Sequence, residues 1–294
     1  EHLKPDGVFA MYNFMRESWL VDRYAATLAG EFSEPPCVID AEARFLSVLV
    51  ATDTPGLLDC PSGSNWSASM DTPSPVSDDQ PFPYLRNAHI PGFYLLTTLL
   101  ILLFSAFSVR AAAGSLNGFR RHYDVFFMGL AFLLLETKNV VQFALLFGTT
   151  WFVNALVFIS VLFSVLLAVE ISQRVRLPKP KILYLFLALS LAANWIIPAE
   201  SLLSLSPVLR LVSAGTLAFL PIFIANLIFA ERFGGEKDST VAFGANILGA
   251  VLGGILEYTA LMIGYRSLLF IVTAAYALAF LADVREKSTN ELSF

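Results

Sequence analysis

Ionisable and amide side chains interrupt one of the long apolar stretches of the chain. They are Glu136, Lys138, Asn139 and Gln142, which stand among leucines, phenylalanines and valines. Charges inside a bilayer are costly, so these side chains should face protein or water rather than lipid. Glu136, Asn139 and Gln142 recur every three residues and should share one helix face. Lys138 points elsewhere and needs another partner, for which Glu257 is the candidate.

A second apolar stretch combines small residues with an amide and a carboxylate. Its members are Gly244, Asn246, Gly249, Gly253, Gly254 and Glu257. Gly249 and Gly253 form a GxxxG pattern, which lets two membrane helices approach closely. Asn246, Gly253 and Glu257 are seven and then four residues apart, so they lie along one stripe of a helix.

Two interpretations of these polar residues stay open. They line a polar pathway or ligand pocket between the two stretches, or they form interhelical hydrogen bonds that hold the bundle together. Polar groups in membranes often serve packing. A transporter-like function requires the residues to converge on one cavity, whereas a scaffold leaves them scattered or bonded to backbone groups.

The elements that carry these residues are apolar runs of about the length that spans a membrane. The chain has 294 residues, a mean hydropathy of +0.66 and 15% charged residues, against about 25% in soluble domains. Crossing the hydrocarbon core takes about 20 apolar residues in a helix. We therefore expect a mainly α-helical polytopic membrane protein, with a transmembrane domain at 93–283 and a polar tail at 284–294. The seven expected spans are 93–113, 124–147, 151–171, 182–198, 208–230, 240–264 and 267–283.

A soluble segment precedes the membrane domain. Short apolar runs predict strands at 8–13, 37–40 and 45–52, and helical spacing predicts a helix over 15–32. The last two strands should be antiparallel neighbours, because their connection is too short for a crossover. Three strands and one helix bury too little surface for an ordinary domain, so we expect residues 1–52 to be the last part of a larger α/β domain.

A linker and junction are predicted at 53–92. Turn-forming residues dominate its first part and predict a flexible surface loop. Cys37 and Cys60 make no metal-site pattern; a disulfide would require an oxidising compartment, and we expect two unpaired thiols. Asp78 and Asp79 are the site-like residues of the soluble part, and their expected role is a solvated junction.

Several motifs together give a resemblance to a known family. Residues 8–21 resemble the late strand and helix of a spermidine-synthase-like domain in fused membrane proteins. DDQPFPYL at 78–85 is similar to that family's D-D-W-P-F-L-Y-L junction, with Gln80 and Pro83 departing from it. LLLETK, FGTTWFVN and FGANILGAVLGG resemble its membrane part. The chain thus resembles, over nearly its whole length, the C-terminal part of fused major-facilitator-like/spermidine synthase proteins.

The resemblance implies an AdoMet-type (Rossmann-like) α/β fold for the soluble part. It also implies aminopropyl transfer from decarboxylated AdoMet to a polyamine as the family's activity. Such a fold holds its nucleoside with a glycine-rich loop, but the glycines of residues 1–92 are all isolated. We therefore expect no cofactor, no metal and no catalytic residue here, and a chain that is not competent for transfer as given. Whether it belongs to an enzyme stays open, and we expect a preceding half upstream of Glu1.

The expected surroundings are the lipid bilayer of a bacterial inner (cytoplasmic) membrane, with other membrane subunits or the missing N-terminal half as partners. The net charge of −5 and the lack of a basic cluster argue against nucleic acid. Loops after odd-numbered spans and the tail hold eleven Lys and Arg residues, against three near the other side. The positive-inside rule then places the N-terminal segment outside the cytoplasm. The family places it inside, so the side stays open.

Three functions compete. The chain is the membrane-embedded C-terminal portion of a spermidine-synthase-like protein, or a transporter-like membrane module, or a non-catalytic scaffold or accessory subunit. In the second function, Glu136, Lys138, Asn246 and Glu257 line a path.

Overall fold

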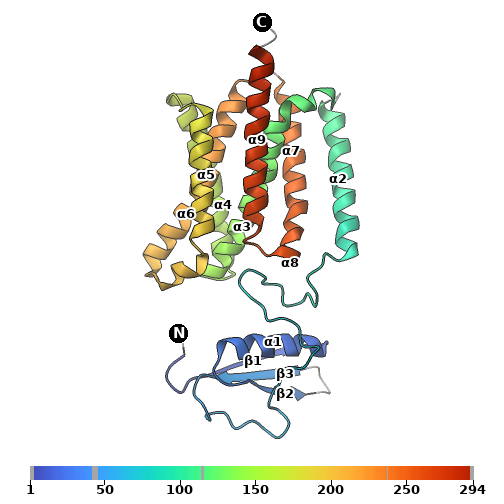
Figure 1. The fold of residues 1–294 in the computed structure, drawn as a ribbon, viewed down its shortest axis with the longest axis vertical. Helices are drawn as coiled ribbons and strands as arrows, with labels where there is room; N and C mark the ends of the chain where they lie inside the picture. The colour runs from blue at the N-terminus through green and yellow to red at the C-terminus, as the bar shows by residue number, and fades with distance from the viewer. Residues whose placement is uncertain (1–2, 42–45, 114–115, 237, 292–294) are drawn as a thin grey trace. The chain divides into compact units, whose positions relative to one another are not determined.

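The computed structural model describes residues 3–41, 46–113, 116–236 and 238–291. The chain forms two compact units, Glu1–His89 and Ile90–Phe294. The first is a small α/β unit, and the second is a bundle of apolar helices (Figure 1).

A three-stranded sheet with one helix forms the first unit. Its elements are β1 (Val8–Phe14), α1 (Ser18–Glu31), β2 (Cys37–Ala41) and β3 (Leu46–Thr52). The strand order is β1-β3-β2, and β3 runs antiparallel to both neighbours. The predicted antiparallel pairing of the last two strands is therefore confirmed. Phe45, which the prediction included in the third strand, lies outside the described residues.

Helix α1 supplies most of the buried core of this unit. The cluster consists of Met15, Leu20, Val21, Ala25 and Leu49. By contrast, β1 is an edge strand, and its Tyr12 and Phe14 side chains are 76% and 69% exposed. An edge strand with exposed aromatic side chains is open to pairing with a further strand. The larger Rossmann-like domain that the sequence predicts stays a prediction.

The segment that follows β3 is held against the sheet, whereas the sequence predicted a flexible surface loop. The Trp66 indole N–H donates to the Asp22 carboxylate over 3.1 Å. The Val38 amide donates to the Ser64 carbonyl over 2.7 Å. These bonds fix the segment to α1 and to β2.

Cys37 of β2 and Cys60 of this segment form a disulfide. The expectation of two unpaired thiols is therefore wrong. Its physical reason is the path of the chain, because the turn-rich segment folds back along β2 and brings Cys60 to the strand.

Arg23 of α1 fixes the end of the segment. Its guanidinium is buried and donates to the backbone carbonyls of Phe82, Pro83, Leu85 and Arg86. It also lies 5.5 Å from the centre of the Trp19 ring. Asp78 lies exposed and Asp79 half-buried in the turn just before these carbonyls.

The second unit is a helical membrane bundle. Among the described residues, six helices are long and apolar enough to cross a membrane. They are α2 (Gly92–Ala113), α3 (Tyr123–Phe147), α4 (Trp151–Arg174), α6 (Pro207–Gly234), α7 (Ser239–Leu256) with its continuation to Ile263, and α9 (Leu268–Glu291). Shorter turns are η2 (Leu116–His122), η3 (Ala199–Ser204), η4 (Glu257–Thr259) and α8 (Ala260–Ile263).

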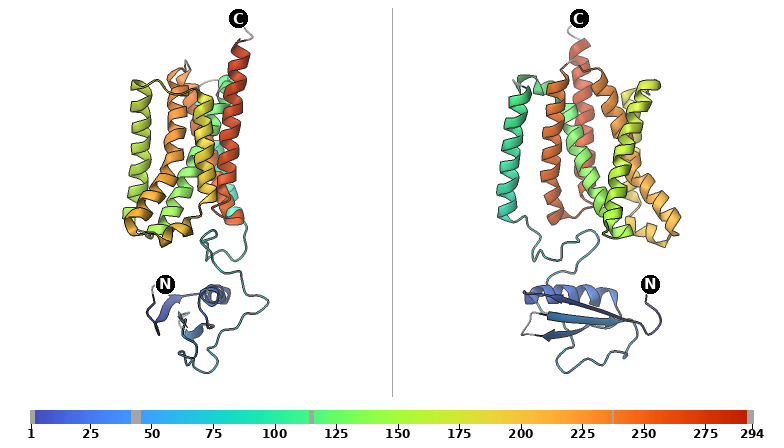
Figure 2. Two further views of the ribbon diagram at one scale, coloured as in Figure 1. Left: turned by 60° about the vertical axis from the view of Figure 1, so that its left-hand side comes forward. Right: turned by 180° about the vertical axis from the view of Figure 1, so that it is seen from behind.

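The fourth expected span is the apolar helix α5 (Pro180–Ile196), which has 17 residues. At 1.5 Å per residue it is about 25 Å long, against a hydrocarbon core of about 30 Å. It runs beside α6 along the bundle (Figures 1 and 2). α3 occupies the interior, in contact with α4, α6, α7 and α9, while α2 packs on α7 (Figure 2).

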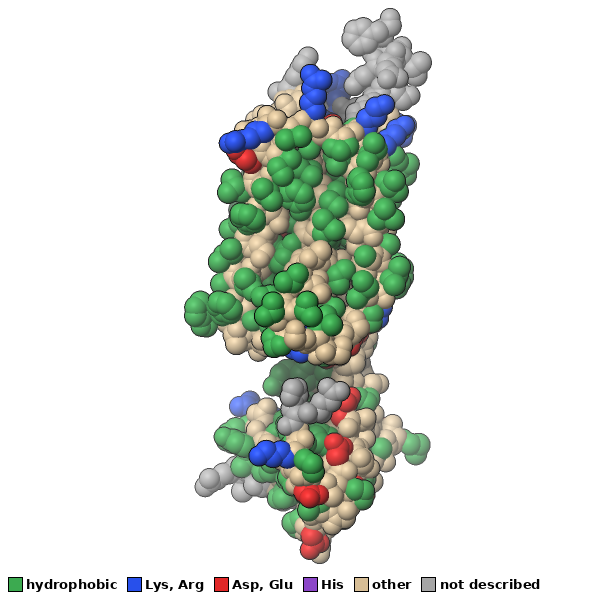
Figure 3. Space-filling view, turned by 90° about the vertical axis from the view of Figure 1, so that its left-hand side faces the viewer, with side chains coloured by type: hydrophobic (Ala, Val, Ile, Leu, Met, Phe, Trp, Pro, Cys, Tyr) green, Lys and Arg blue, Asp and Glu red, His purple; other side chains and the backbone are tan. Residues whose placement is uncertain are grey.

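The lateral surface of the bundle is apolar, as a surface in contact with lipid should be. Figure 3 shows hydrophobic side chains over its length and Lys and Arg side chains gathered near the end where the C-terminus lies. We call this the basic end. It carries Arg110, Arg120, Arg121, Arg174, Arg176, Lys179, Lys181, Arg232 and Arg285. Lys237 lies outside the described residues, as does the side chain of Lys287.

Candidate functional site

Small residues let α3 and α7 approach closely. A Cβ at Gly249 would overlap the carbonyl oxygen of Phe126, and one at Gly253 would lie 2.5 Å from that of Leu130. Gly129 of α3 meets the backbone of Asn246 in the same way. The two stretches that the sequence singled out are thus neighbours, and the GxxxG surface lies in their contact.

Two of the amide side chains form interhelical hydrogen bonds to backbone. Asn246 donates from Nδ2 to the Val125 carbonyl of α3 over 2.9 Å. Asn139 is fully buried and donates to the Ala218 carbonyl of α6 over 2.9 Å. These bonds fit the packing role, in which a polar group holds two helices together.

Lys138 is buried, but the expected pairing with Glu257 is wrong. Its ammonium donates to Gln142 Oε1, one turn further along α3, and to Asn194 Oδ1 of α5 over 3.2 Å. The reason is the direction of the side chain, since Lys138 reaches Asn194 of α5 whereas Glu257 lies at the C-terminal end of α7. Two amide oxygens therefore take the place of the expected carboxylate.

Glu257 lies where α7 ends and η4 begins, and it is half-buried. Its charge acts on Tyr265, in the connection to α9. Burial, and then the negative charge of Glu257, raise the pKa of the Tyr265 hydroxyl. Glu257 thus lies apart from the other polar candidates.

Glu136 opens onto a cavity of about 320 Å³ inside the bundle, which we call the Glu136 cavity. Its lining comes from α3, α4, α6, α7 and α9: Met128, Gly129, Phe132, Leu133, Glu136, Val165, Ala225, Asn226, Phe229, Asn246, Ala250 and Tyr276. Two of the predicted residues, Glu136 and Asn246, therefore share one cavity. Lys138, Asn139, Gln142 and Glu257 are not part of its lining.

Three polar groups of this cavity lack a hydrogen-bond partner. Among the described residues, neither a hydrogen bond nor an ion pair engages the Glu136 carboxylate. The Tyr276 hydroxyl has no partner although the residue is only 4% exposed, and neither has Asn226 Nδ2. Buried polar groups are normally satisfied, so three open groups around one space indicate room for a polar ligand or water.

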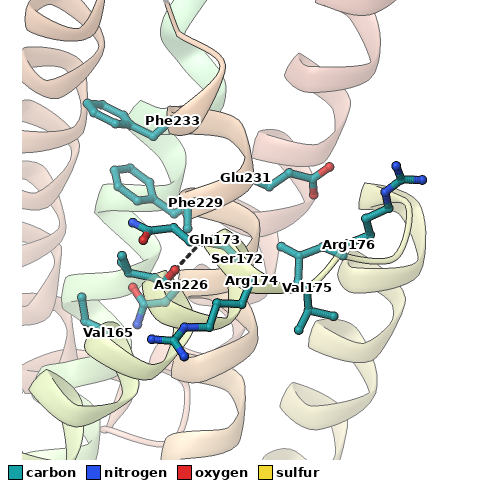
Figure 4. A pocket seen from close by; sticks show the side chains of 14 residues that line it. Val165, Ser172, Gln173, Arg174, Val175, Arg176, Asn226, Phe229, Glu231 and Phe233 are labelled. Carbon is teal, nitrogen blue, oxygen red and sulfur yellow. Dashed lines mark hydrogen bonds between the residues drawn. The ribbon is translucent and has the colours of Figure 1, made fainter.

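A larger cavity of about 930 Å³ lies between the ends of α4 and α6 (Figure 4). We call it the outer cavity. Its walls include Ser172, Gln173, Arg174 and Arg176, so it belongs to the basic end. Val165, Asn226 and Phe229 line both cavities, and Figure 4 shows Asn226 beside Val165. These three side chains therefore stand between the outer cavity and the Glu136 cavity.

A charged cluster lies at the same end, where α3 begins and α6 ends. Arg232 donates to Asp124 over 2.5 Å and to Glu236 over 2.8 Å, and His122 Nδ1 lies 3.6 Å from Glu236. Burial raises the pKa of Glu236, but hydrogen bonds from the Asp238 amide and from Arg232 and the nearby positive charges outweigh it. The pKa of Glu236 therefore lies below its usual value.

Asn226 and Tyr276 were not among the residues that the sequence predicted for a site. A signal existed, since each is a polar residue within an apolar span, but neither lies in the spans 124–147 and 240–264, from which the site residues were predicted. Asp78 and Asp79 belong to the other unit and line none of these cavities. Within the described part of the chain, no group of three His, Cys, Asp or Glu residues could hold a metal ion.

Comparisons with known proteins give no match: no family model, no curated protein and no solved structure matches the chain. The resemblance to spermidine-synthase-like membrane proteins therefore rests on the sequence motifs alone. The cavities of the bundle are therefore the features from which a function can be inferred.

Proposed function

We propose that the bundle is a transporter-like membrane module in which the outer cavity admits a small solute or ion to Glu136. The observation that carries this proposal is the Glu136 cavity, where an unpaired carboxylate, a hydroxyl and an amide surround one space. Ionisable residues within membrane helices typically mark solute, ion or proton paths. Three residues shared with the outer cavity connect this space to the basic end.

Of the four residues expected to line a path, only Glu136 and Asn246 reach this cavity, so the proposed path excludes Lys138 and Glu257. Asn139, Lys138 and Gln142 use their polar groups to join α3 to α5 and α6, which is the scaffold role. That leaves Glu136 as the charged residue of α3 without such a bond. The bundle thus separates polar groups that hold helices from polar groups that face open space.

Cysteine labelling tests whether water and solutes reach Asn226, which lies between the outer cavity and the Glu136 cavity. In membrane vesicles, Asn226→Cys should react with a membrane-impermeant methanethiosulfonate reagent added at the basic side. Leu100→Cys is the matched control, because Leu100 of α2 is 58% exposed on the lipid-facing surface and should stay unreactive. An Asn226→Cys that is unreactive from both sides would favour the scaffold function instead, and labelling only from the opposite side would contradict entry through the outer cavity.

A second candidate is the C-terminal portion of a spermidine-synthase-like protein, with its nucleoside-binding half elsewhere. The observation that favours it is the open edge of β1, where a larger sheet would continue. Because the chain has no glycine-rich loop, calorimetric titration of the purified chain with AdoMet and decarboxylated AdoMet should show no binding. Micromolar binding would contradict this account and would mean that residues 1–92 hold a complete site.

A further inference from the structure

We infer that the Glu136 cavity binds a small organic ammonium ion, with the Glu136 carboxylate as its counter-ion. This inference rests on the proposed function and names the class of solute. It starts from charge: Glu136 is the one acidic residue among the twelve residues that line the cavity, and none of the described lining residues is basic. A cation entering the cavity therefore meets an acceptor and no competing positive charge.

Hydrogen bonding makes the cavity suited to an ammonium group. The Glu136 carboxylate accepts up to about four hydrogen bonds, and the Tyr276 hydroxyl accepts as well as donates. Both groups lack partners among the described residues. An R–NH3⁺ group carries three donors and no acceptor. Such a ligand satisfies the carboxylate and the phenol together, leaving the Asn226 amide for water or for a polar substituent of the ligand.

The remaining walls favour an organic ion over a bare metal ion. Phe132, Leu133, Val165, Phe229 and Ala250 present apolar surface, and the two phenylalanine rings can face a cation. Hard metal ions prefer several oxygen ligands. A space of about 320 Å³ is at the small end of ligand cavities, so the ion is a small amine with a short apolar body.

Calorimetric titration of the purified full chain in detergent tests the inference. The probes are n-butylammonium chloride, the neutral isostere 1-butanol, and sodium chloride. We expect saturable binding of n-butylammonium alone. Glu136→Gln should weaken it about ten- to hundredfold, as losing one member of a buried charge pair does. Glu257→Gln is the matched control, because Glu257 is also a half-buried carboxylate but lies outside the cavity. The Glu257→Gln chain should bind n-butylammonium with the wild-type affinity.

A second variant keeps the test decisive if Glu136→Gln does not fold. Tyr276→Phe removes the unpaired hydroxyl and should weaken n-butylammonium binding several-fold without changing the thermal midpoint. Three results would overturn the inference. The wild-type chain fails to bind n-butylammonium, or both cavity variants bind it with the wild-type affinity, or sodium binds as tightly as n-butylammonium. The cysteine labelling is an independent test of the proposed function. A labelled Asn226→Cys without ammonium binding would support access through the outer cavity and contradict the ammonium site. Ammonium binding without labelling would support the site and contradict access through the outer cavity.

Discussion

Buried polar residues of α3 meet the membrane interior in two different ways. The Lys138 ammonium is surrounded by amide oxygens from its own helix and from α5. Glu136, only two residues earlier, faces a cavity without a protein partner among the described residues. A desolvated charge without compensation costs several kcal/mol. We therefore expect Lys138 to contribute to the stability of the bundle and Glu136 to contribute to ligand binding in the cavity.

Asn194→Leu should destabilise the bundle by about 1–3 kcal/mol, because it removes one acceptor from a buried ammonium. Thermal unfolding in detergent measures this effect. Adding Lys138→Met should recover part of the loss, since it removes the charge that has lost its partner. Glu257→Gln, which does not contact Lys138, should leave the midpoint unchanged; a large drop would restore the pairing that the sequence first predicted.

The pH dependence of stability should reflect Glu236. Its folded-state pKa is depressed, so it contributes stability that is fully present above its unfolded pKa, near 4.5, and is lost as the pH falls through the folded value. Midpoints measured from pH 7 down to about pH 3 should fall more steeply for the wild-type chain than for Glu236→Gln. Parallel profiles for the two proteins would show that the cluster with Arg232 and His122 adds no stability.

At the scale of elements, run length and periodicity predicted much of the fold. The strands end within about two residues of their predicted bounds, and β2 pairs with β3 as the short connection required. The apolar runs became helices, because lipid leaves the backbone no other way to satisfy its hydrogen bonds. The GxxxG spacing also identified two helices that are neighbours.

The partners of individual side chains could not be predicted in the same way. Which way Lys138 points depends on how α3 is rotated against α5, and Asn194 lies in the predicted span 182–198, which contains no charged residue. The Glu136 cavity is formed by five helices, so no single segment carries its signature. The disulfide likewise depends on the path of a turn-rich segment that has no periodicity.

The contact between α3 and α7 should not tolerate even a methyl group. Gly249→Ala places a Cβ against the Phe126 carbonyl and should cost about 1–3 kcal/mol or more. Gly215→Ala is the matched control in α6, where a Cβ meets its nearest atom at 4.0 Å; it should be neutral or stabilise by about 1 kcal/mol. Unfolding midpoints in detergent give the comparison, and equal values for the two variants would contradict the close approach.

At the scale of the whole molecule, two features point to the same side for the soluble unit. The chain enters the bundle at Gly92, at the end opposite the basic loops, and positive charges favour the cytoplasm. The Cys37–Cys60 disulfide is of a kind that persists in oxidising compartments. We therefore predict that this unit lies outside the cytoplasm, away from cytoplasmic nucleoside substrates, which weighs against the aminopropyltransferase interpretation.

Labelling with a bulky maleimide tests this orientation. In intact cells, Cys37 and Cys60 should react only after an impermeant reductant is added, because they are paired and accessible from outside. Reaction in untreated cells, or only after lysis, would reverse the orientation. Replacing both cysteines with alanine should destabilise the soluble unit by about 3 kcal/mol, since the disulfide closes a loop across 23 residues.

The glycine contact between α3 and α7 also has a mechanical consequence. Backbones that touch through carbonyl oxygens cannot slide without collision, so these two helices form a fixed frame, and Glu136 is carried on it. By contrast, α4 contains no glycine, and a Cβ at Gly215 or Gly234 of α6 would meet no atom closer than 4.0 Å. The Val165, Asn226 and Phe229 side chains of these two helices line both cavities. If solute is released to the other face of the membrane, we therefore expect α4 and α6 to move, while α3, α7 and the Glu136 carboxylate keep their positions.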